Sequence, residues 1–182
     1  MQSTAKPITT QRRLILVRHA HAVTEDEGGD HARALSAQGV AQAAALGDWL
    51  RAQSWLPEAA LCSTAARTRQ TLGILAESLR AAGACPFLPT QLSDRLYLAS
   101  VGDLLAQIQA ADDAVETLLV VCHNPGAHGL LGLLVDEAAT DADAEQLLLQ
   151  FPPSACALLT LPATHWRDVA PQSARLEVLR AG

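Results

Sequence analysis

The stretch RLILVRH, residues 13–19, is a short run of branched apolar residues that ends in charge. This pattern is typical of a buried strand with a polar exit. The runs EAALCS at 58–63 and TLLVVC at 117–122 have the same character, and the latter is the strongest strand signal in the sequence. Further strands are expected around residues 87–88, 155–161 and 175–179. Together these runs predict a central sheet.

Helical patterns stand between the strands. We expect helices over about 36–53 and 65–83, from 100 onward and from 124 onward, and a short exposed helix over 136–149. Ser36 and Ser100 are suitable N-caps, Gly83 is a natural stop, and Pro125 suits the first turn of a helix. Strands that alternate with helices predict a three-layer α/β/α fold with a mostly parallel central sheet.

Composition limits the class of protein. The chain of 182 residues fits one domain, and we expect a mobile tail over 1–11 followed by a single domain over 12–182. The net charge of −6 argues against a nucleic-acid binder, and no apolar run reaches the roughly 18 residues of a membrane span. Residues 1–13 lack an apolar segment of signal-peptide length, and the four cysteines form no CxxC pair. We therefore expect reduced cysteines and a cytoplasmic protein.

Three strand ends carry residues that suit one anionic ligand. The first strand ends in Arg18 and His19, the second in Ser63 with Arg67 four residues later, and the third is followed by His123. Ligands of α/β folds bind at the carboxyl ends of the strands. Because arginines bind phosphate through paired hydrogen bonds and helix N-termini supply amide donors, these residues predict a phosphate site.

The same segments resemble the histidine phosphatase superfamily. LVRHAHA at 16–22 resembles its Arg-His-Gly signature, with Ala20 in place of the glycine. CSTAARTRQT at 62–71 resembles its Ser-x-x-x-Arg-x-x-Gln-Thr segment, and VVCHNPG at 120–126 resembles the surroundings of its second histidine. DHARALSAQG at 30–39 is similar to the Asp-x-x-Arg-x-Leu-x-x-x-Gly stretch of SixA-like phosphohistidine phosphatases, with Arg33 and Gly39 at the matching positions.

The resemblance implies a phosphoglycerate mutase-like fold without an inserted cap. It also implies a phosphatase that works through a phosphohistidine intermediate, with no metal and no organic cofactor. His19 is then the nucleophile, and Arg18, Arg67 and His123 hold the phosphoryl group. LSDRLYLAS at 92–100 resembles the family's acid-bearing segment, which makes Asp94 the candidate proton donor. The expected substrate is a phosphorylated protein, such as a histidine phosphotransfer domain.

The residues themselves suggest how the two histidines differ. His19 attacks only as a neutral imidazole, and the neighbouring cations Arg18 and Arg67 favour a lowered pKa, which a bound anion opposes. His123, if protonated, can donate a hydrogen bond to a phosphoryl oxygen. Transfer to His19 followed by hydrolysis is ordinary covalent catalysis.

Other interpretations stay open. A small phosphate ester is an alternative substrate, and a phospho-ligand binding module without turnover is an alternative class. His19 and His21 form a His-x-His pattern found in metal sites, although the nearby arginines disfavour a divalent cation. Arg33 either contacts phosphate or substrate, or pairs with Asp30 or Asp26. We interpret His31, His128 and His165 as ordinary loop or helix residues.

Overall fold

A central six-stranded sheet organises the molecule. The computed structural model describes residues 11–81, 83, 87–135 and 150–182. The strand order is β3-β2-β4-β1-β5-β6, with β2, β3, β4 and β1 parallel, β5 antiparallel to β1, and β6 antiparallel to β5. The strands are β1 (Arg12–Arg18), β2 (Ala59–Ser63), β3 (Thr90–Ser93), β4 (Thr117–Cys122), β5 (Cys156–Leu161) and β6 (Arg175–Arg180). The predicted mostly parallel sheet is confirmed.

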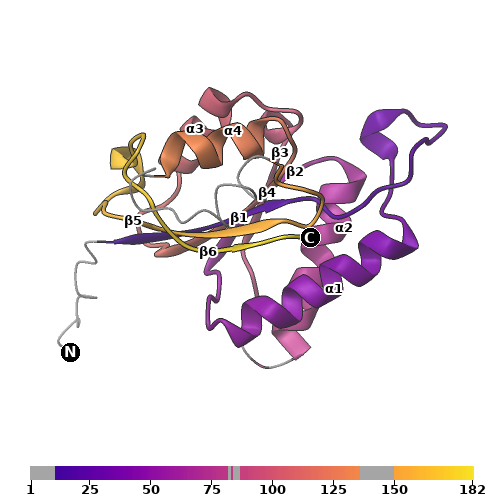
Figure 1. Ribbon diagram of the computed structural model, residues 1–182, viewed down its shortest axis with the longest axis horizontal. Helices are drawn as coiled ribbons and strands as arrows, with labels where there is room; N and C mark the ends of the chain where they lie inside the picture. The colour runs from indigo at the N-terminus through magenta and orange to yellow at the C-terminus, as the bar shows by residue number, and fades with distance from the viewer. Residues whose placement is uncertain (1–10, 82, 84–86, 136–149) are drawn as a thin grey trace.

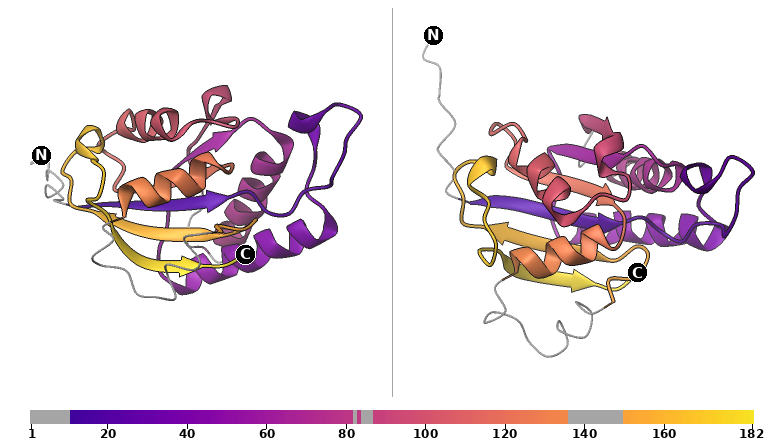
Figure 2. Two further views of the ribbon diagram at one scale, coloured as in Figure 1. Left: turned by 45° about the horizontal axis from the view of Figure 1, so that its top comes forward. Right: turned by 90° about the horizontal axis from the view of Figure 1, so that it is seen from above.

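Helices cover both faces of the sheet (Figures 1 and 2). They are α1 (Ala37–Ala52), α2 (Ala66–Ala81), α3 (Val101–Gln109) and α4 (Gly126–Leu134). Alternate residues of β1 face opposite layers: Leu14 and Leu16 pack with α3 and α4, whereas Ile15 and Val17 pack with α1 and α2. Because both faces of β1 are buried in aliphatic core, the three-layer α/β/α prediction is confirmed.

The predicted helix starts agree with the structure. Ser36 Oγ accepts a hydrogen bond from the Gly39 amide at 3.1 Å, and Ser100 Oγ accepts one from Asp103 at 3.2 Å, so both serines are N-caps. Within the described ranges, the short 3-10 turns η1 (Asp30–Ala32), η2 (Asp94–Leu96) and η4 (Trp166–Asp168) were not predicted. The first two lie beside the site described below.

The strand expected around Phe87 and Leu88 is wrong in position. The structure places β3 at Thr90–Ser93, and Phe87 is 77% exposed. β3 is an edge strand whose place is set by backbone pairing with β2, with Ala60 opposite Thr90, rather than by apolar burial. The helix expected over 136–149 and the tail expected over 1–11, apart from Gln11, fall outside the described residues.

Cys62, Cys122 and Cys156 are free and buried, as expected of reduced core residues. Burial raises the pKa of the Cys62 and Cys122 thiols to about 12. Among the helices of the described residues, none has the length and apolar character needed to span a membrane.

Candidate active site

The carboxyl ends of three neighbouring strands meet at one edge of the sheet. β1 runs parallel to β4 with Arg18 opposite Cys122, and β4 runs parallel to β2 with Val121 opposite Cys62. His19 and His123 follow β1 and β4 directly, and their ring centroids are 5.1 Å apart. The structure therefore brings the two predicted histidines together.

The His19 imidazole is held in one tautomer. Its Nδ1 lies 2.8 Å from the carbonyl oxygen of Ala20, which can only accept, so Nδ1 carries the hydrogen and Nε2 keeps its lone pair. Burial is the main cause that lowers the pKa of His19 to about 4, with help from Arg67, Arg18 and Arg33 and opposition from the Ala20 hydrogen bond. At pH 7 this ring is a neutral imidazole suited to nucleophilic attack through Nε2.

His123 has a different set of contacts. Its Nε2 lies 2.8 Å from Ser63 Oγ, which also accepts the Ala65 amide hydrogen at 3.4 Å. Its Nδ1 is buried with no hydrogen-bond partner among the described residues. Burial, followed by the electrostatic influence of His19 and Arg67, lowers the pKa of His123 to about 3. In the free protein this ring is therefore neutral at pH 7, and the protonated donor considered from the sequence stays a prediction.

Two guanidinium groups complete the cluster. Arg67 is 2% exposed, and its terminal nitrogens donate to the backbone oxygen of Asp30 at 2.6 Å and to its carboxylate at 3.0 Å. Arg18 donates from Nη1 to the carbonyl oxygen of Phe151 at 3.1 Å. The Nε atoms of both arginines are buried without a partner in the part of the chain that the structure describes. Since a buried donor without a partner costs free energy, both atoms are suited to bind an anion.

The segment before β5 fixes one side of the site. The Phe151 carbonyl accepts hydrogen bonds from Arg18 and from Asn124 Nδ2, the latter at 3.0 Å. The Ser154 amide donates to the carbonyl of His19 at 3.0 Å. The contacts of Phe151 with Arg18 and of Ser154 with His19 join residues more than a hundred positions apart, and no local pattern in the sequence indicates them.

Asp30 is the centre of the polar contacts on the other side. Its carboxylate accepts from Tyr97 Oη at 2.6 Å, from Arg67, and from Arg33 Nε at 2.9 Å. The hydrogen bond from Tyr97, followed by that from Arg67, holds the pKa of this carboxyl well below its usual range. Arg33 also donates to the carbonyl of Val23 at 2.8 Å. The structure thus shows the predicted pairing of Arg33 with Asp30, and contact of Arg33 with phosphate stays a prediction.

The residues that follow Arg67 attach α2 to the neighbouring loops. Gln70 Oε1 accepts from the Leu35 amide at 2.7 Å, and Thr71 Oγ1 accepts from the buried Ala20 amide at 3.1 Å. Both bonds hold the chain on either side of the loop that carries Asp30. The Gln-Thr pair therefore positions backbone rather than ligand.

Asp94 begins the η2 turn and accepts a hydrogen bond from Thr64 Oγ1 at 2.5 Å. The same hydroxyl lies 3.0 Å from His31 Nε2. Tyr97, at the end of η2, has its ring 5.5 Å from that of His123 and 4.8 Å from that of His31, centroid to centroid. Asp94 is exposed, and among the described residues its side chain bonds to Thr64 rather than to His19 or His123, so its role as proton donor stays a prediction.

His21 is turned away from this cluster. Its Nδ1 lies 2.8 Å from Ser36 Oγ at the start of α1, and its ring is exposed. A Cβ on Gly39 would lie 1.9 Å from the His21 carbonyl oxygen, which explains the glycine at this position. Within the described ranges, no group of three or more His, Cys, Asp or Glu side chains is placed to hold a metal ion.

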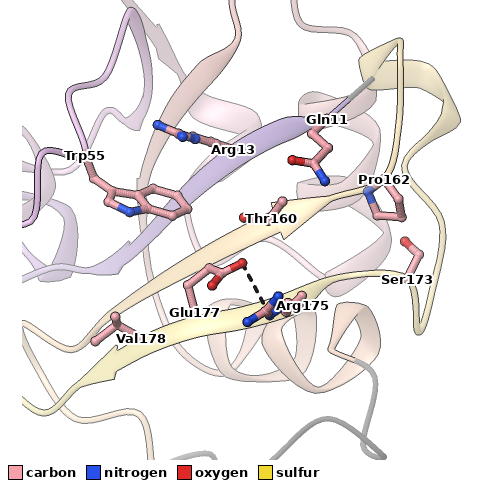
Figure 3. Close-up of a pocket in the computed structure, with 9 residues that line it drawn as sticks. All are labelled: Gln11, Arg13, Trp55, Thr160, Pro162, Ser173, Arg175, Glu177 and Val178. Carbon is pink, nitrogen blue, oxygen red and sulfur yellow. Dashed lines mark ion pairs between the residues drawn. The ribbon is translucent and has the colours of Figure 1, made fainter. Parts of the chain in front are cut away.

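One cavity lies elsewhere on the sheet. It measures about 550 Å³ and is lined by Arg13, Trp55 and Glu177 among others (Figure 3). Arg13 stands near the start of β1, whereas His19 follows its end, so this hollow contains none of the predicted site residues. A second cavity of about 550 Å³ is lined by Asp30 and Arg33 and opens beside the site.

Two neighbouring histidines, the half-buried Arg18 and the buried Arg67 gather at the carboxyl ends of parallel strands, an arrangement suited to phosphoryl transfer in an α/β protein. A sequence model of the histidine phosphatase superfamily (branch 1) matches residues 14–117, and the chain belongs to that superfamily. Phosphatase chemistry of the histidine phosphatase type is therefore supported.

Relatives extend over nearly the whole chain. An uncharacterised protein of Mycobacterium tuberculosis is 40% identical over 164 residues, which cover 88% of this chain and 96% of the relative. The structure of a proposed phosphohistidine phosphatase SixA from Nakamurella multipartitia is similar with a TM-score of 0.80 and 31% identity, covering 95% of this chain and 97% of that one. A proposed SixA from Agrobacterium tumefaciens has a TM-score of 0.71 at 29% identity, over 94% and 99% of the two chains.

A phosphoglycerate mutase from Plasmodium falciparum shares the fold alone, with a TM-score of 0.56 and 17% identity over 96% of this chain and 91% of that one. The expected phosphoglycerate mutase-like fold is confirmed.

Proposed function

We propose that this protein removes phosphate from phosphohistidine on another protein, through a phosphorylated His19 and without metal or organic cofactor. The observation that carries the proposal is the pair of neighbouring histidine rings, whose centroids are 5.1 Å apart. His19 keeps an unprotonated Nε2, and Nδ1 of His123 has no hydrogen-bond partner in the described residues. One ring is suited to attack phosphorus, and the other to bind a phosphoryl oxygen.

The reaction proceeds in two displacements. Nε2 of His19 attacks the phosphorus atom as the bond from phosphorus to the leaving nitrogen breaks, and the leaving imidazole takes a proton from solvent water. Water then attacks the phosphorylated His19, inorganic phosphate leaves, and Nε2 recovers its lone pair. Arg18, Arg67 and His123 bind the phosphoryl oxygens in both steps, where charge neutralisation is the main requirement.

Several features support the substrate class. The segment from Asp30 to Gly39 is similar to that of SixA-like proteins, and relatives at 31% and 29% identity are proposed phosphohistidine phosphatases. The positive charges of Arg18 and Arg67 take the place of a metal ion in neutralising phosphate, which supports a metal-independent reaction. A phosphotransfer domain in the cytoplasm is the proposed partner, and Arg33 is the proposed additional contact with substrate.

The test uses the purified chain and a histidine phosphotransfer domain labelled with ³²P on histidine. We expect release of phosphate, transient label on the wild-type chain, and neither with His19→Ala, whereas His21→Ala as the matched histidine control remains active. Exhaustive chelation should leave the rate unchanged. Full activity of His19→Ala would refute the proposed nucleophile, and faster release from sugar phosphates than from the phosphoprotein would refute the substrate class.

A further inference from the structure

Four aromatic rings from separate parts of the chain form a row that begins at the proposed nucleophile. The ring centroids of His19 and His123 are 5.1 Å apart, and Tyr97 follows at 5.5 Å from His123. His31 comes next, with its centroid 4.8 Å from that of Tyr97. Tyr97 meets both of its neighbours edge-on, at interplanar angles of 90° and 68°, which is a favourable geometry for aromatic rings. Tyr97 and His31 thus extend the histidine pair by an aromatic wall.

Tyr97 borders two of the groups proposed to bind the phosphoryl group. Besides its contact with His123, its ring centroid lies 5.9 Å from the guanidinium carbon of Arg67. Within the described residues, the ring of His19 is in contact with that of His123 and not with that of Tyr97. In-line transfer places the nucleophile and the leaving group on opposite sides of phosphorus. The leaving group of a phosphoryl group bound by His123 and Arg67 is therefore expected to extend toward Tyr97.

The Tyr97 ring is fixed at both ends. Its backbone amide donates to the carbonyl of Asp94 at 3.0 Å, and its hydroxyl donates at 2.6 Å to the same Asp30 carboxylate oxygen that Arg67 binds. The next residue, Leu98, has a φ of +48°, a left-handed conformation that is unfavourable for leucine and is found at ligand sites more often than elsewhere. Tyr97 is half-buried and His31 is exposed, so the wall is both rigid and open to solvent.

We propose that Tyr97 is a specificity-determining residue whose ring contacts the leaving group, so that the site selects phosphoryl groups carried on a planar aromatic ring. This inference rests on the phosphatase function proposed above, and the imidazole of phosphohistidine is such a ring. A flat π-system gains from packing against tyrosine, whereas an amine or a sugar has no such system to offer. The preference for phosphohistidine over sugar phosphates then has a physical origin in one side chain.

The test compares phosphoimidazole with phosphoramidate. Both carry phosphorus on nitrogen, and only phosphoimidazole has a ring. The constant kcat/KM covers the steps up to departure of the leaving group, whereas hydrolysis of phosphorylated His19 is common to both substrates. The ratio of the two kcat/KM values therefore reports on contacts with the leaving group, and the intrinsic reactivity of each substrate cancels when variants are compared.

Tyr97→Leu removes the ring and keeps an apolar side chain. We expect the ratio of kcat/KM for phosphoimidazole to that for phosphoramidate to fall about fivefold, within the range of a single aromatic contact. Tyr97→Phe keeps the ring and removes the hydrogen bond to Asp30, and it should retain the wild-type ratio. Phe87→Leu, at a ring that is 77% exposed before β3, is the matched control and should also retain it.

Three outcomes would overturn the contact with the leaving group. They are equal losses on both substrates in Tyr97→Leu, an unchanged ratio in that variant, and a fall of the ratio in Tyr97→Phe as large as in Tyr97→Leu, which would assign the effect to the hydrogen bond. Transfer of ³²P from phosphoramidate to His19 reports separately on the proposed function. A wild-type chain that takes up no label refutes the nucleophile, whereas a labelled chain with an unchanged ratio in Tyr97→Leu refutes the aromatic contact alone.

Discussion

The half-buried His19 imidazole makes the stability of the fold depend on pH in a defined window. Its pKa is about 4 in the folded protein, against 6.5 for an unperturbed histidine. The unfolded chain therefore binds more protons than the folded one between these values, and the free energy of unfolding rises with pH across the window. Below about pH 4 His19 is protonated in both the folded and the unfolded state, and the loss of stability caused by this residue is complete.

The magnitude follows from the same two values. A difference of about 2.5 pKa units, at 1.36 kcal/mol per unit, corresponds to about 3 kcal/mol of stability lost as the pH falls from 6.5 to 4. His19→Ala removes this loss. The stability difference between the wild type and His19→Ala should therefore change by about 3 kcal/mol in favour of the variant over that range.

Urea unfolding at several pH values between 7 and 4 measures this difference. His21→Ala is the matched control, because its exposed ring bonds to Ser36 outside the cluster. Inorganic phosphate at saturating concentration should reduce the loss, since a bound anion raises the pKa of His19. Parallel pH dependence in the wild type and His19→Ala would refute the assignment of a neutral nucleophile.

Further substitutions test separate parts of the framework. Gly39→Ala places a Cβ 1.9 Å from a backbone oxygen and should destabilise the fold by about 2 kcal/mol or more. Gly73→Ala, where a Cβ would meet nothing within 4 Å, should stabilise the fold by up to about 1 kcal/mol. If thermal unfolding shows the same effect for both variants, the packing argument is contradicted. Thr71→Val leaves the buried Ala20 amide without its acceptor and should cost about 1–3 kcal/mol in urea unfolding, so a neutral effect would count against that bond. Ser63→Ala removes the hydrogen bond between Ser63 and Nε2 of His123, and calorimetry should show inorganic phosphate binding weakened about tenfold. Ser173→Ala is the control and should bind phosphate like the wild type. Equal phosphate affinities of Ser63→Ala and the wild type would show that Ser63 does not orient the His123 ring.

The sequence predicts the parts of the site that lie at strand ends. Arg18, His19 and His123 adjoin short apolar runs, and the parallel pairing of those runs makes their ends coincide. Periodicity and caps likewise predict the four helices, because both depend on residues close in the chain. The edge strand β3 is misplaced because its pairing with β2, rather than its own apolar residues, determines where it lies.

The remaining parts of the site depend on contacts between distant segments. The Phe151 carbonyl, the Tyr97 hydroxyl and the Thr64 hydroxyl each bind partners at least 30 positions away, and none of these residues stands out by type. Asp30 is predicted as a partner of Arg33, but its bond to Arg67 depends on how η1 packs against α2. His31, interpreted from the sequence as an ordinary loop residue, acquires its contacts in the same way.

The position of β1 in the sheet constrains how the protein is made. β1 is synthesised first, yet its two neighbours, β4 and β5, begin only at Thr117 and Cys156. A ribosome that has translated residues up to 116 therefore carries an apolar strand with both edges unpaired, a state prone to association with other chains. The carbonyl of Phe151 emerges later still, so Arg18 acquires this contact when most of the chain has left the ribosome. Phosphate binding thus becomes a late event in biosynthesis, and a nascent chain truncated before residue 151 is expected to need a chaperone and to lack activity.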